Sequence, residues 1–529
     1  MPLNARDVAF ILTVCGVTTL NVFLVGSITV ALPTIGKDLK FTESNLQWPV
    51  NIYSLSYGCL LLLFGRIGDI VGGKVMFIAG SLWFAIWSLI TAFASNDIFF
   101  IVAMALKGIG SAANTPAAIG LCSSYFPPGP NRNTAYTALG IGQPIGFILG
   151  LVLGGLLTES SATWRSLFYI QASLSALLTV SSVIVFPKDQ GNRRYTKGLD
   201  WGGAILSTAG LGLLTYSLSD STTARKGWST PQIPSLLSIS IAILVAFLYY
   251  ERWREAKSKS VLMPLSIWRQ SSAKMGPLMG VVFFGWWSFN TLNYFFTLYY
   301  QQVQLLNPFQ TSLRFVPMAL SGILPNLAAG FFMSRIPAPV LMVIGTLSTA
   351  SSTILFALID IHLSFWKMAF FMMITICGID VIYPIGNMQI AAAFDEDSQS
   401  LAGGIFNVTI RLATSLGLAV TSSISTATSK KYITEHPQLD PNSPEVLMVG
   451  FRAAGWTLLG SALIAVLIVL IWMRDLGVIG RQMLARTGTR VSAQEMPMND
   501  IKVDSPSATK VGAGDVQLST QTVETMSST

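Results

Sequence analysis

Three ionisable side chains, those of Lys107, Asp380 and Arg411, stand inside long apolar stretches of the sequence. If such a stretch crosses a bilayer, a charge at its centre costs about 2.5–3.5 kcal/mol, so these residues are expected to serve a substrate or ion pathway. Burial and a neighbouring cation shift a carboxylic pKa in opposite directions. Asp380 can therefore bind and release a proton if a cation approaches and leaves it. A fixed ion pair that only holds two helices together is the alternative.

Uncharged polar residues accompany these charges at helical spacing. The stripes are Lys107 with Asn114, Asn290 with Asn293, Asp380 with Tyr383 and Asn387, and Asn407 with Arg411. Residues three, four or seven positions apart share one face of a helix, so each stripe predicts a polar lining along a substrate or proton pathway. Hydrogen bonds between helices, each worth about 0.6–2 kcal/mol, are the alternative use of the uncharged members.

Other kinds of chemistry lack the residues that they need. The chain has two histidines, and its four cysteines lie in apolar stretches without a Cys-x-x-Cys pair, so we expect no metal and no cofactor. No Gly-x-x-x-x-Gly-Lys-Ser/Thr loop is present to bind ATP for a pump. No basic stripe interleaves with aromatic residues, which argues against nucleic acid as a partner. We therefore expect no catalytic residues and no enzyme.

Composition predicts the elements that carry the polar stripes. The 529 residues are 52% hydrophobic and 11% charged, whereas soluble domains are roughly one quarter charged. A helix needs about 20 mostly apolar residues to cross a bilayer. Such runs begin near Phe10, Trp48, Val75, Ile98, Thr134, Leu167, Trp201, Pro234, Met275, Thr311, Pro339, Phe365, Leu401 and Phe451. The expected fold is an all-α polytopic membrane protein with fourteen transmembrane helices.

The distribution of Lys and Arg predicts the orientation in the bilayer. With the N-terminus in the cytoplasm, the inner segments carry about 21 of these residues and the outer segments about 10, as the positive-inside rule requires. We expect a multi-pass protein of the cell membrane with both termini cytoplasmic. Residues 476–529 should form a cytoplasmic tail, disordered from about 490, because Ser, Thr, Asp and Gln dominate there and aromatic residues are missing.

A glycine-rich segment, Gly65–Lys74, stands between the second and third runs. Its glycines, among them Gly65 and Gly73, allow two helices to approach closely in a tight turn. Asp69 precedes the third helix, whose N-terminal dipole favours an anion. Lys74 is expected to anchor the turn at the headgroups.

The fifth run contains glycines at every fourth position. Gly142, Gly146 and Gly150 lie on one helix face, which predicts close packing against a neighbour. Pro144 between them leaves one backbone carbonyl without its helical partner and permits a bend.

Both motifs resemble signatures of the major facilitator superfamily. Gly65–Lys74 resembles its loop between spans two and three, with Ile70 where a basic residue is usual. The Gly-x-Pro-x-Gly core around Pro144 is similar to the motif that marks proton-coupled antiporters in this family. Met104 and Lys107 stand where relatives have Arg and Gln, so a cation is kept at a displaced position. With fourteen spans, the likeness covers nearly the whole chain and favours the fungal-type drug:proton antiporter branch.

The resemblance implies two six-helix bundles related by pseudo-symmetry, at 1–187 and 275–475. A linker at 188–274 with two extra transmembrane helices joins them. It also implies a monomeric secondary active transporter that exports small, mostly apolar or aromatic compounds, drugs or secondary metabolites, by proton antiport with alternating access. A proton-coupled importer or a siderophore transporter of the same fold is the alternative.

Overall fold

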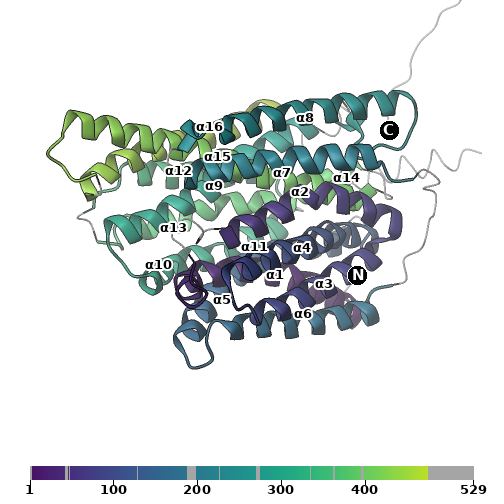
Figure 1. Ribbon diagram of the computed structural model, residues 1–529. Coiled ribbons are helices and arrows are strands. Elements are labelled where there is room, and N and C mark those ends of the chain that lie inside the picture. The colour runs from purple at the N-terminus through teal and green to yellow at the C-terminus, as the bar shows by residue number, and fades with distance from the viewer. Residues whose placement is uncertain are drawn as a thin grey trace, which may run out of the picture. The chain divides into compact units, whose positions relative to one another are not determined.

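The computed structural model describes residues 3–41, 46, 48–127, 129–187, 198–224, 227–269, 274–333, 335–361, 364–394, 398–441 and 443–474. All regular secondary structure in these ranges is helical, which confirms the all-α class (Figure 1). Twelve helical segments have the length and apolar composition to cross a membrane. Two further helices, α7 and α9, have 23 and 24 residues and are not among these twelve, and with them the described residues contain the predicted fourteen. The predicted tail at 476–529 lies outside the described residues.

The N-terminal half contains six helices, one for each crossing. They are α1 (Ala5–Asp38), α2 (Trp48–Val71), α3 (Gly73–Ala92), α4 (Asp97–Tyr125), α5 (Pro130–Glu159) and α6 (Arg165–Val185). In this half α1 packs along α5, and α4 packs between α2 and α3. The helices begin and end close to the predicted runs because helix length is set by the apolar stretch that must cross the bilayer.

The C-terminal half has the same number of crossings, but two of them are interrupted. Its elements are α9 (Met275–Leu298) with a π-helical turn η3 (Tyr299–Val303), α10 (Pro308–Ser321), α11 (Ile323–Phe332), α12 (Ala338–Ala357), α13 (Ala369–Thr375), a 3₁₀ stretch η4 (Ile376–Val381), α14 (Ile382–Ala393), α15 (Gln399–Glu435) and α16 (Pro444–Trp472). The pair α10 and α11 forms one crossing, and α13, η4 and α14 form another.

Proline explains both interruptions. A proline cannot donate to the carbonyl four residues earlier, and its ring crowds that carbonyl. Pro325 stands four residues after Ser321, where α10 ends. Pro384 stands four residues after Asp380, inside the 3₁₀ stretch. The apolar runs that begin near Thr311 and Phe365 predict one helix each, and neither run indicates that the interruptions fall beside the candidate proton site.

The predicted glycine face of α5 packs against the backbone of α1. A β-carbon added at Gly142 would lie 2.8 Å from Oγ1 of Thr19, and one at Gly146 would overlap the Thr19 carbonyl oxygen. A β-carbon at Gly150 would likewise meet the backbone of Phe23. Because the glycines carry no side chain, the two helices approach closely, and this face fixes α1 and α5 as a rigid pair.

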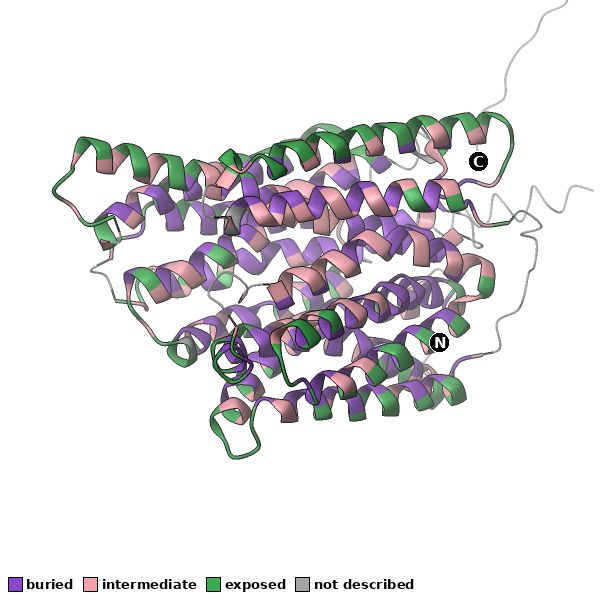
Figure 2. Ribbon diagram, in the orientation of Figure 1, coloured by how far each residue is buried: buried purple, intermediate pink, exposed green. Residues whose placement is uncertain are grey.

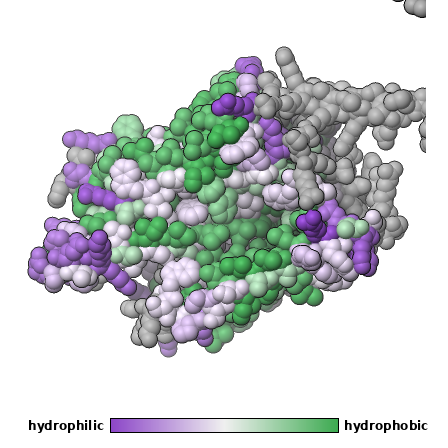
Figure 3. All heavy atoms as spheres, turned by 90° about the horizontal axis from the view of Figure 1, so that it is seen from above, coloured by the Kyte–Doolittle hydropathy of each residue, from purple (hydrophilic) through white to green (hydrophobic). Residues whose placement is uncertain are grey.

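Two helices stand between the halves in the sequence, α7 (Trp201–Thr223) and α8 (Gln232–Ala256). Helix α7 packs against α2 of one half and α15 of the other, whereas α8 packs mainly on α7. Figure 2 shows that α8 is exposed along most of its length. A broad apolar belt lies between hydrophilic ends in Figure 3, as expected of a surface that faces lipid acyl chains.

A group of buried polar contacts of the linker lies where α7 begins and α8 ends. Asp200 caps α7 by accepting a hydrogen bond from the Gly203 amide at 3.0 Å, and it pairs with Arg254 of α8 at 3.1 Å. Glu251 accepts hydrogen bonds from the amides of Leu262 and Met263, which hold the start of the segment leading to α9. The linker is therefore anchored by buried polar contacts rather than by apolar packing alone.

Candidate functional site

The two halves meet along two seams of helices. In the first seam, α2 and α4 pack against α15. In the second, α5 packs against α10, α11 and α14. Substrate sites of transporters built from repeats lie near mid-membrane between the halves, so the polar residues at these seams define the candidate site.

Asp380 lies at the second seam, where three irregular segments meet. It belongs to the 3₁₀ stretch η4, and its Oδ2 would lie 3.2 Å from a β-carbon added at Gly322, between α10 and α11. The same β-carbon would lie 3.1 Å from Pro144 of α5. The side chain is half-buried, and the described residues provide no hydrogen bond or ion pair to it. The structure therefore shows no partner for the fixed ion pair that the sequence left open.

Arg411 lies at the first seam. Its guanidinium stacks over the ring of Tyr57 at 4.4 Å, and its Cβ would lie 3.5 Å from a β-carbon added at Gly58. The side chain is half-buried, and no described carboxylate lies within 4.0 Å of it. Arg411 and Asp380 are thus not joined in an ion pair, and they line different seams.

A buried polar network of the N-terminal half supports the ring under Arg411. It joins side chains of α1, α2 and α4: Asn21, Tyr53, Tyr57, Ser111, Asn114 and Thr115. The Tyr57 hydroxyl donates to Thr115 at 3.0 Å, and the Asn21 amide donates to Asn114 at 3.0 Å. Asn114, a predicted pathway residue, is fully buried in this network. Because every member is uncharged, the network fixes the position of Tyr57 without neutralising Arg411.

Aromatic rings and amides gather on the C-terminal side of the candidate site. The rings of Trp286, Tyr383 and Phe406 lie 5.5–6.3 Å apart, from three different crossings. The amide of Asn290 donates to Thr414 at 2.7 Å and thereby links α9 to α15. Such rings with a few fixed polar groups are typical of sites for organic molecules.

The other predicted amides on these helices are placed as follows. The Asn387 amide donates to the Tyr383 carbonyl at 2.9 Å, and that of Asn407 donates to Gly403 one turn earlier. The Oδ1 atoms of Asn387 and Asn293 are buried and have no hydrogen-bond partner among the described residues. An amide oxygen without a partner can accept a bond from a ligand or a water molecule, so these two residues remain candidates for the pathway.

Lys107 lies away from both seams. It is fully buried within the N-terminal half, between α3, α4 and α6. Its ammonium donates to Gln171 and stacks near the rings of Phe84 and Phe168, at 4.8 and 4.7 Å. Its role in the pathway stays a prediction, because these contacts do not bring it to the other candidates.

Asp69 links the two halves at one end of the first seam. Its Oδ1 accepts a hydrogen bond from the Ser400 amide at 2.8 Å, and its Oδ2 accepts one from the Leu401 amide at 3.1 Å. These amides open α15, so the carboxylate satisfies the N-terminus of α15. The prediction that Asp69 interacts with the N-terminus of the third helix is wrong, because its partner amides lie 331 and 332 positions away in the sequence.

Small residues allow this contact, which we call the Asp69 latch. A β-carbon at Gly65 would lie 3.0 Å from the Ser400 carbonyl oxygen, and one at Gly73 would lie 3.2 Å from Leu121. Lys74 donates to the Phe186 carbonyl at 2.7 Å, at the end of α6. It therefore caps a helix C-terminus in addition to any contact with headgroups.

Comparison with known proteins agrees with this architecture. The sequence pattern of the Major Facilitator Superfamily matches residues 14–418. The chain belongs to this superfamily. MFS-type transporter 1 of Pyricularia oryzae is 31% identical over 90% of this chain and 85% of its own length. Efflux pump terJ of Aspergillus terreus is 27% identical, with coverage of 80% and 82%. The low affinity ammonium transporter of Saccharomyces cerevisiae is also 27% identical, with coverage of 79% and 81%.

A solved structure shows the same fold. The crystal structure of the human organic anion transporter MFSD10 (TETRAN) superimposes with a TM-score of 0.61, covering 89% of this chain and all of that one. The sequence identity is 13%, so the likeness concerns the fold alone. The match to the family pattern over residues 14–418 confirms the predicted membership of the superfamily.

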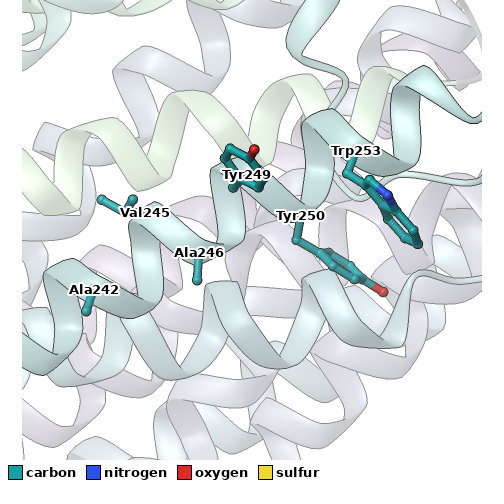
Figure 4. Close-up of a pocket in the computed structure, with 6 residues that line it drawn as sticks. All are labelled: Ala242, Val245, Ala246, Tyr249, Tyr250 and Trp253. Carbon is teal, nitrogen blue, oxygen red and sulfur yellow. The ribbon is translucent and has the colours of Figure 1, made fainter.

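This transporter has a shallow apolar depression that includes no residue of the two seams. It is lined by residues of α8 only: Ala242, Val245, Ala246, Tyr249, Tyr250 and Trp253 (Figure 4). Most of these side chains are exposed and apolar or aromatic. They suit contact with lipid rather than the binding of a transported molecule.

Several site residues of this superfamily member escaped the sequence analysis. Tyr53 and Tyr57 are one helical turn apart in α2, and Asn21 is an isolated amide in an apolar helix. The turn spacing and the isolated amide were visible in the sequence. Gly322 offered no such signal, since its role depends on which helix passes beside it.

Proposed function

We propose that this protein is a secondary active exporter of small, mostly apolar or aromatic organic compounds, such as drugs or secondary metabolites. Inward proton flow drives export by antiport with alternating access. It works as a monomer in the plasma membrane, with both termini in the cytoplasm. Its substrate and proton pathway uses Asp380, Arg411 and the amides of the two seams.

The observation that carries this proposal is the position of Asp380. It is half-buried, without a described partner, where η4 meets the Gly322 interruption and Pro144 of α5. A carboxyl group with no fixed counter-ion can exchange its proton with water when the surrounding helices move apart. Interrupted helices are where such movement is easiest, because their backbone hydrogen bonds are already incomplete.

Alternating access requires two halves that separate at each end in turn. We assign the moving bundles to residues 1–187 and 275–475, with 188–274 as the linker. The Asp69 latch supports this assignment because it joins α2 to the N-terminus of α15, one helix from each bundle. Opening that end must break these two hydrogen bonds, and closing it must form them again.

The direction of transport is proposed from the relatives. One relative is named as an efflux pump and another as a low affinity ammonium transporter. The aromatic cluster of Trp286, Tyr383 and Phe406 favours a larger organic compound over a small ion, because flat rings bind apolar surface. Proton-coupled import is the second candidate, favoured by the name of the ammonium transporter.

Inverted membrane vesicles from a host that expresses the chain provide the test. Vesicles with an acidic lumen are exposed to a library of aromatic compounds while luminal pH is followed with a trapped dye. Antiport predicts that a substrate accumulates in the lumen and that the lumen becomes more alkaline as protons leave. Vesicles that carry the Asp380→Asn variant at equal protein level are the control.

The result also separates the two candidates. Accumulation with loss of luminal protons supports export, because the lumen corresponds to the outside of the cell. Substrate leaving preloaded vesicles together with protons supports import. No response to any compound, or a response that Asp380→Asn leaves unchanged, contradicts proton antiport through this residue.

A further inference from the structure

We propose that Arg411 binds an anionic group of the substrate. The cargo is then an amphipathic organic acid, with an aromatic or apolar body and one carboxylate, sulfonate or phosphate group. This inference rests on the proposed function, since it names the chemical class that the same site transports.

The first observation is the depth at which Arg411 lies. It follows the first residue of α15, Gln399, by twelve positions, which is about 18 Å along a helix. A bilayer's apolar core is about 30 Å thick, so the guanidinium lies near its middle. Holding a charge there costs about 2.5–3.5 kcal/mol unless something compensates it. The protein is expected to retain such a residue only if the binding of a ligand offsets this free-energy cost.

The second observation is that the described part of the chain offers no anion to Arg411. The ion pairs found there are Arg165 with Asp38 and Arg254 with Asp200, neither of which involves it. Asp380 is the carboxylate at a comparable depth, and it contacts Gly322 at the other seam. An anion from outside the protein is therefore the missing counter-charge.

The third observation concerns the part of the guanidinium that is free. Its face is covered by the ring of Tyr57, whose hydroxyl is held by Thr115. Stacking on a ring leaves the N–H groups at the edge of the guanidinium free to donate. That edge presents two parallel donors, which match a carboxylate, sulfonate or phosphate and not a neutral apolar compound.

The surrounding residues complete a site for an amphipathic molecule. Asn407 and Thr414 lie four residues before and three after Arg411, so all three share one helix face. Thr414 is bound to Asn290 of α9, which places this face toward the other helices of the seam. Phe406 continues on the same helix into the aromatic cluster, where an apolar body would pack.

An anionic cargo also agrees with export. When an anion leaves and a proton enters, two charges move in the direction that an inside-negative potential favours. Each charge gains about 2.3 kcal/mol per 100 mV. Anion export by proton antiport therefore draws on the membrane potential as well as on the pH gradient.

Equilibrium binding to the full chain, purified in detergent, tests the inference without any gradient. The probes are tritiated 2-naphthylacetate, the neutral 2-naphthylacetamide and the cationic 2-(2-naphthyl)ethylammonium, which share one ring system. The wild type should bind the acid at least about tenfold more tightly than the amide, the usual gain from a charge-assisted hydrogen bond. Arg411→Gln should weaken binding of the acid by about tenfold or more and change binding of the amide by less than about twofold.

Two further variants make the comparison specific. Arg411→Lys keeps the charge but loses the paired donors, so it should retain part of the preference for the acid. Arg452→Gln removes a charge of the same kind from α16, where Arg452 is exposed and donates to the Ile359 carbonyl. It should bind all three probes as the wild type does.

Several outcomes would overturn the inference. One is a wild type that binds the acid no more tightly than the amide, which needs no variant to fold. Another is an Arg411→Gln protein that loses the acid and the amide equally, because that indicates a structural role. Preference for the ammonium probe would assign the site to a cation. A failure of proton antiport in vesicles would leave the binding result intact, so the two proposals fail separately.

Discussion

At the scale of single residues, the three intramembrane charges differ in their surroundings. Lys107 is enclosed by Gln171 and two phenylalanine rings inside one half. Arg411 rests on Tyr57 at a seam between the halves, and Asp380 lies at the other seam. Only a group at a seam changes its surroundings when the halves move, so Asp380 and Arg411 are better placed than Lys107 to couple movement to binding.

Asp380→Asn should abolish uphill transport but preserve downhill exchange of substrate. The amide has the size of the acid but cannot release a proton, so the seam keeps its packing while coupling is lost. We expect pH-driven uptake into inverted vesicles to fall to background, while exchange of labelled for unlabelled substrate persists at about the wild-type rate. Both rates are measured in the same vesicles at equal protein level.

Asp97→Asn is the matched control for this variant. Asp97 is also an acid of a transmembrane helix, but within the described part of the chain its side chain accepts a hydrogen bond only from the adjacent Ile98 amide, at the start of α4. Its replacement should leave both rates unchanged. Full pH-driven uptake by Asp380→Asn would mean that another group carries the proton. Loss of both rates together with low expression would assign Asp380 a structural role.

The sequence predicted the types of these residues but not their environments. The same rule applies to Lys107, Asp380 and Arg411, because the free-energy cost of inserting a charge into the bilayer depends on its depth and not on its neighbours in the protein. Which of them faces a seam depends on the packing of helices far apart in the sequence. The sequence was therefore sufficient to identify these three candidates, but the fold was needed to show which of them lie at a seam.

At the scale of elements, the Asp69 latch joins α2 to the N-terminus of α15. Replacement of an anion at a helix N-terminus by a neutral amide costs about 0.3–2 kcal/mol. Asp69→Asn should shift the transporter toward the form in which this end is open. A cysteine at Ile405, which is buried one turn beyond the latch, should react about two- to thirtyfold faster with a thiol reagent in a cysteine-free background.

The control for the latch is Asp7→Asn. Asp7 accepts hydrogen bonds from the Asn4 amide and from the Tyr125 hydroxyl within the N-terminal half, so it does not join the two halves. Its replacement should leave the reactivity of the cysteine introduced in place of Ile405 unchanged. Equal labelling rates in Asp69→Asn and the wild type would show that the two hydrogen bonds do not determine opening.

The glycine face of α5 makes a separate prediction about stability. In Gly146→Ala the added methyl group would overlap the Thr19 carbonyl oxygen, and a backbone cannot rotate away as a side chain can. We expect a loss of about 1–3 kcal/mol, the usual cost of overpacking. It should appear as a lower midpoint of thermal unfolding in detergent, measured by tryptophan fluorescence.

Gly460→Ala in α16 is the matched variant. A β-carbon at Gly460 would meet no neighbouring atom of the described residues within 4 Å. Alanine there should leave stability unchanged or raise it by up to about 1 kcal/mol, because a helical glycine has a larger entropy loss on folding. If both variants have the wild-type midpoint, α1 and α5 can separate without cost and the face is not a rigid contact.

The helices could be predicted from the sequence where local rules determine them. The membrane thickness fixed the fourteen crossings, and the four-residue spacing identified the packing face of α5. The partner of that face, α1, and the partner of Asp69, α15, depend on tertiary structure and were not predictable. The prolines at 325 and 384 were visible, but their effect on the helix depends on whether neighbours supply the lost hydrogen bonds.

At the scale of the whole molecule, the arrangement of the two halves and the linker leads to a test of orientation. The Asp69 latch, the N-terminus of α1 and the linker contacts of Asp200 and Glu251 lie at the same end, because successive helices alternate in direction. The Lys and Arg count predicts that this end is cytoplasmic. Cysteines introduced at Gln438, which is exposed after α15, and at Ser519 in the tail can be labelled on intact cells with a membrane-impermeant thiol reagent in a cysteine-free background.

We expect labelling at Gln438 before lysis and at Ser519 only after lysis. This pattern puts the latch at the cytoplasmic end, so opening it admits substrate from the cell. Labelling at Ser519 and not at Gln438 on intact cells would reverse the orientation. The latch would then close the outer end, Lys and Arg would be enriched outside against the usual rule, and the proposed direction of export would have to be derived again from the reversed cycle.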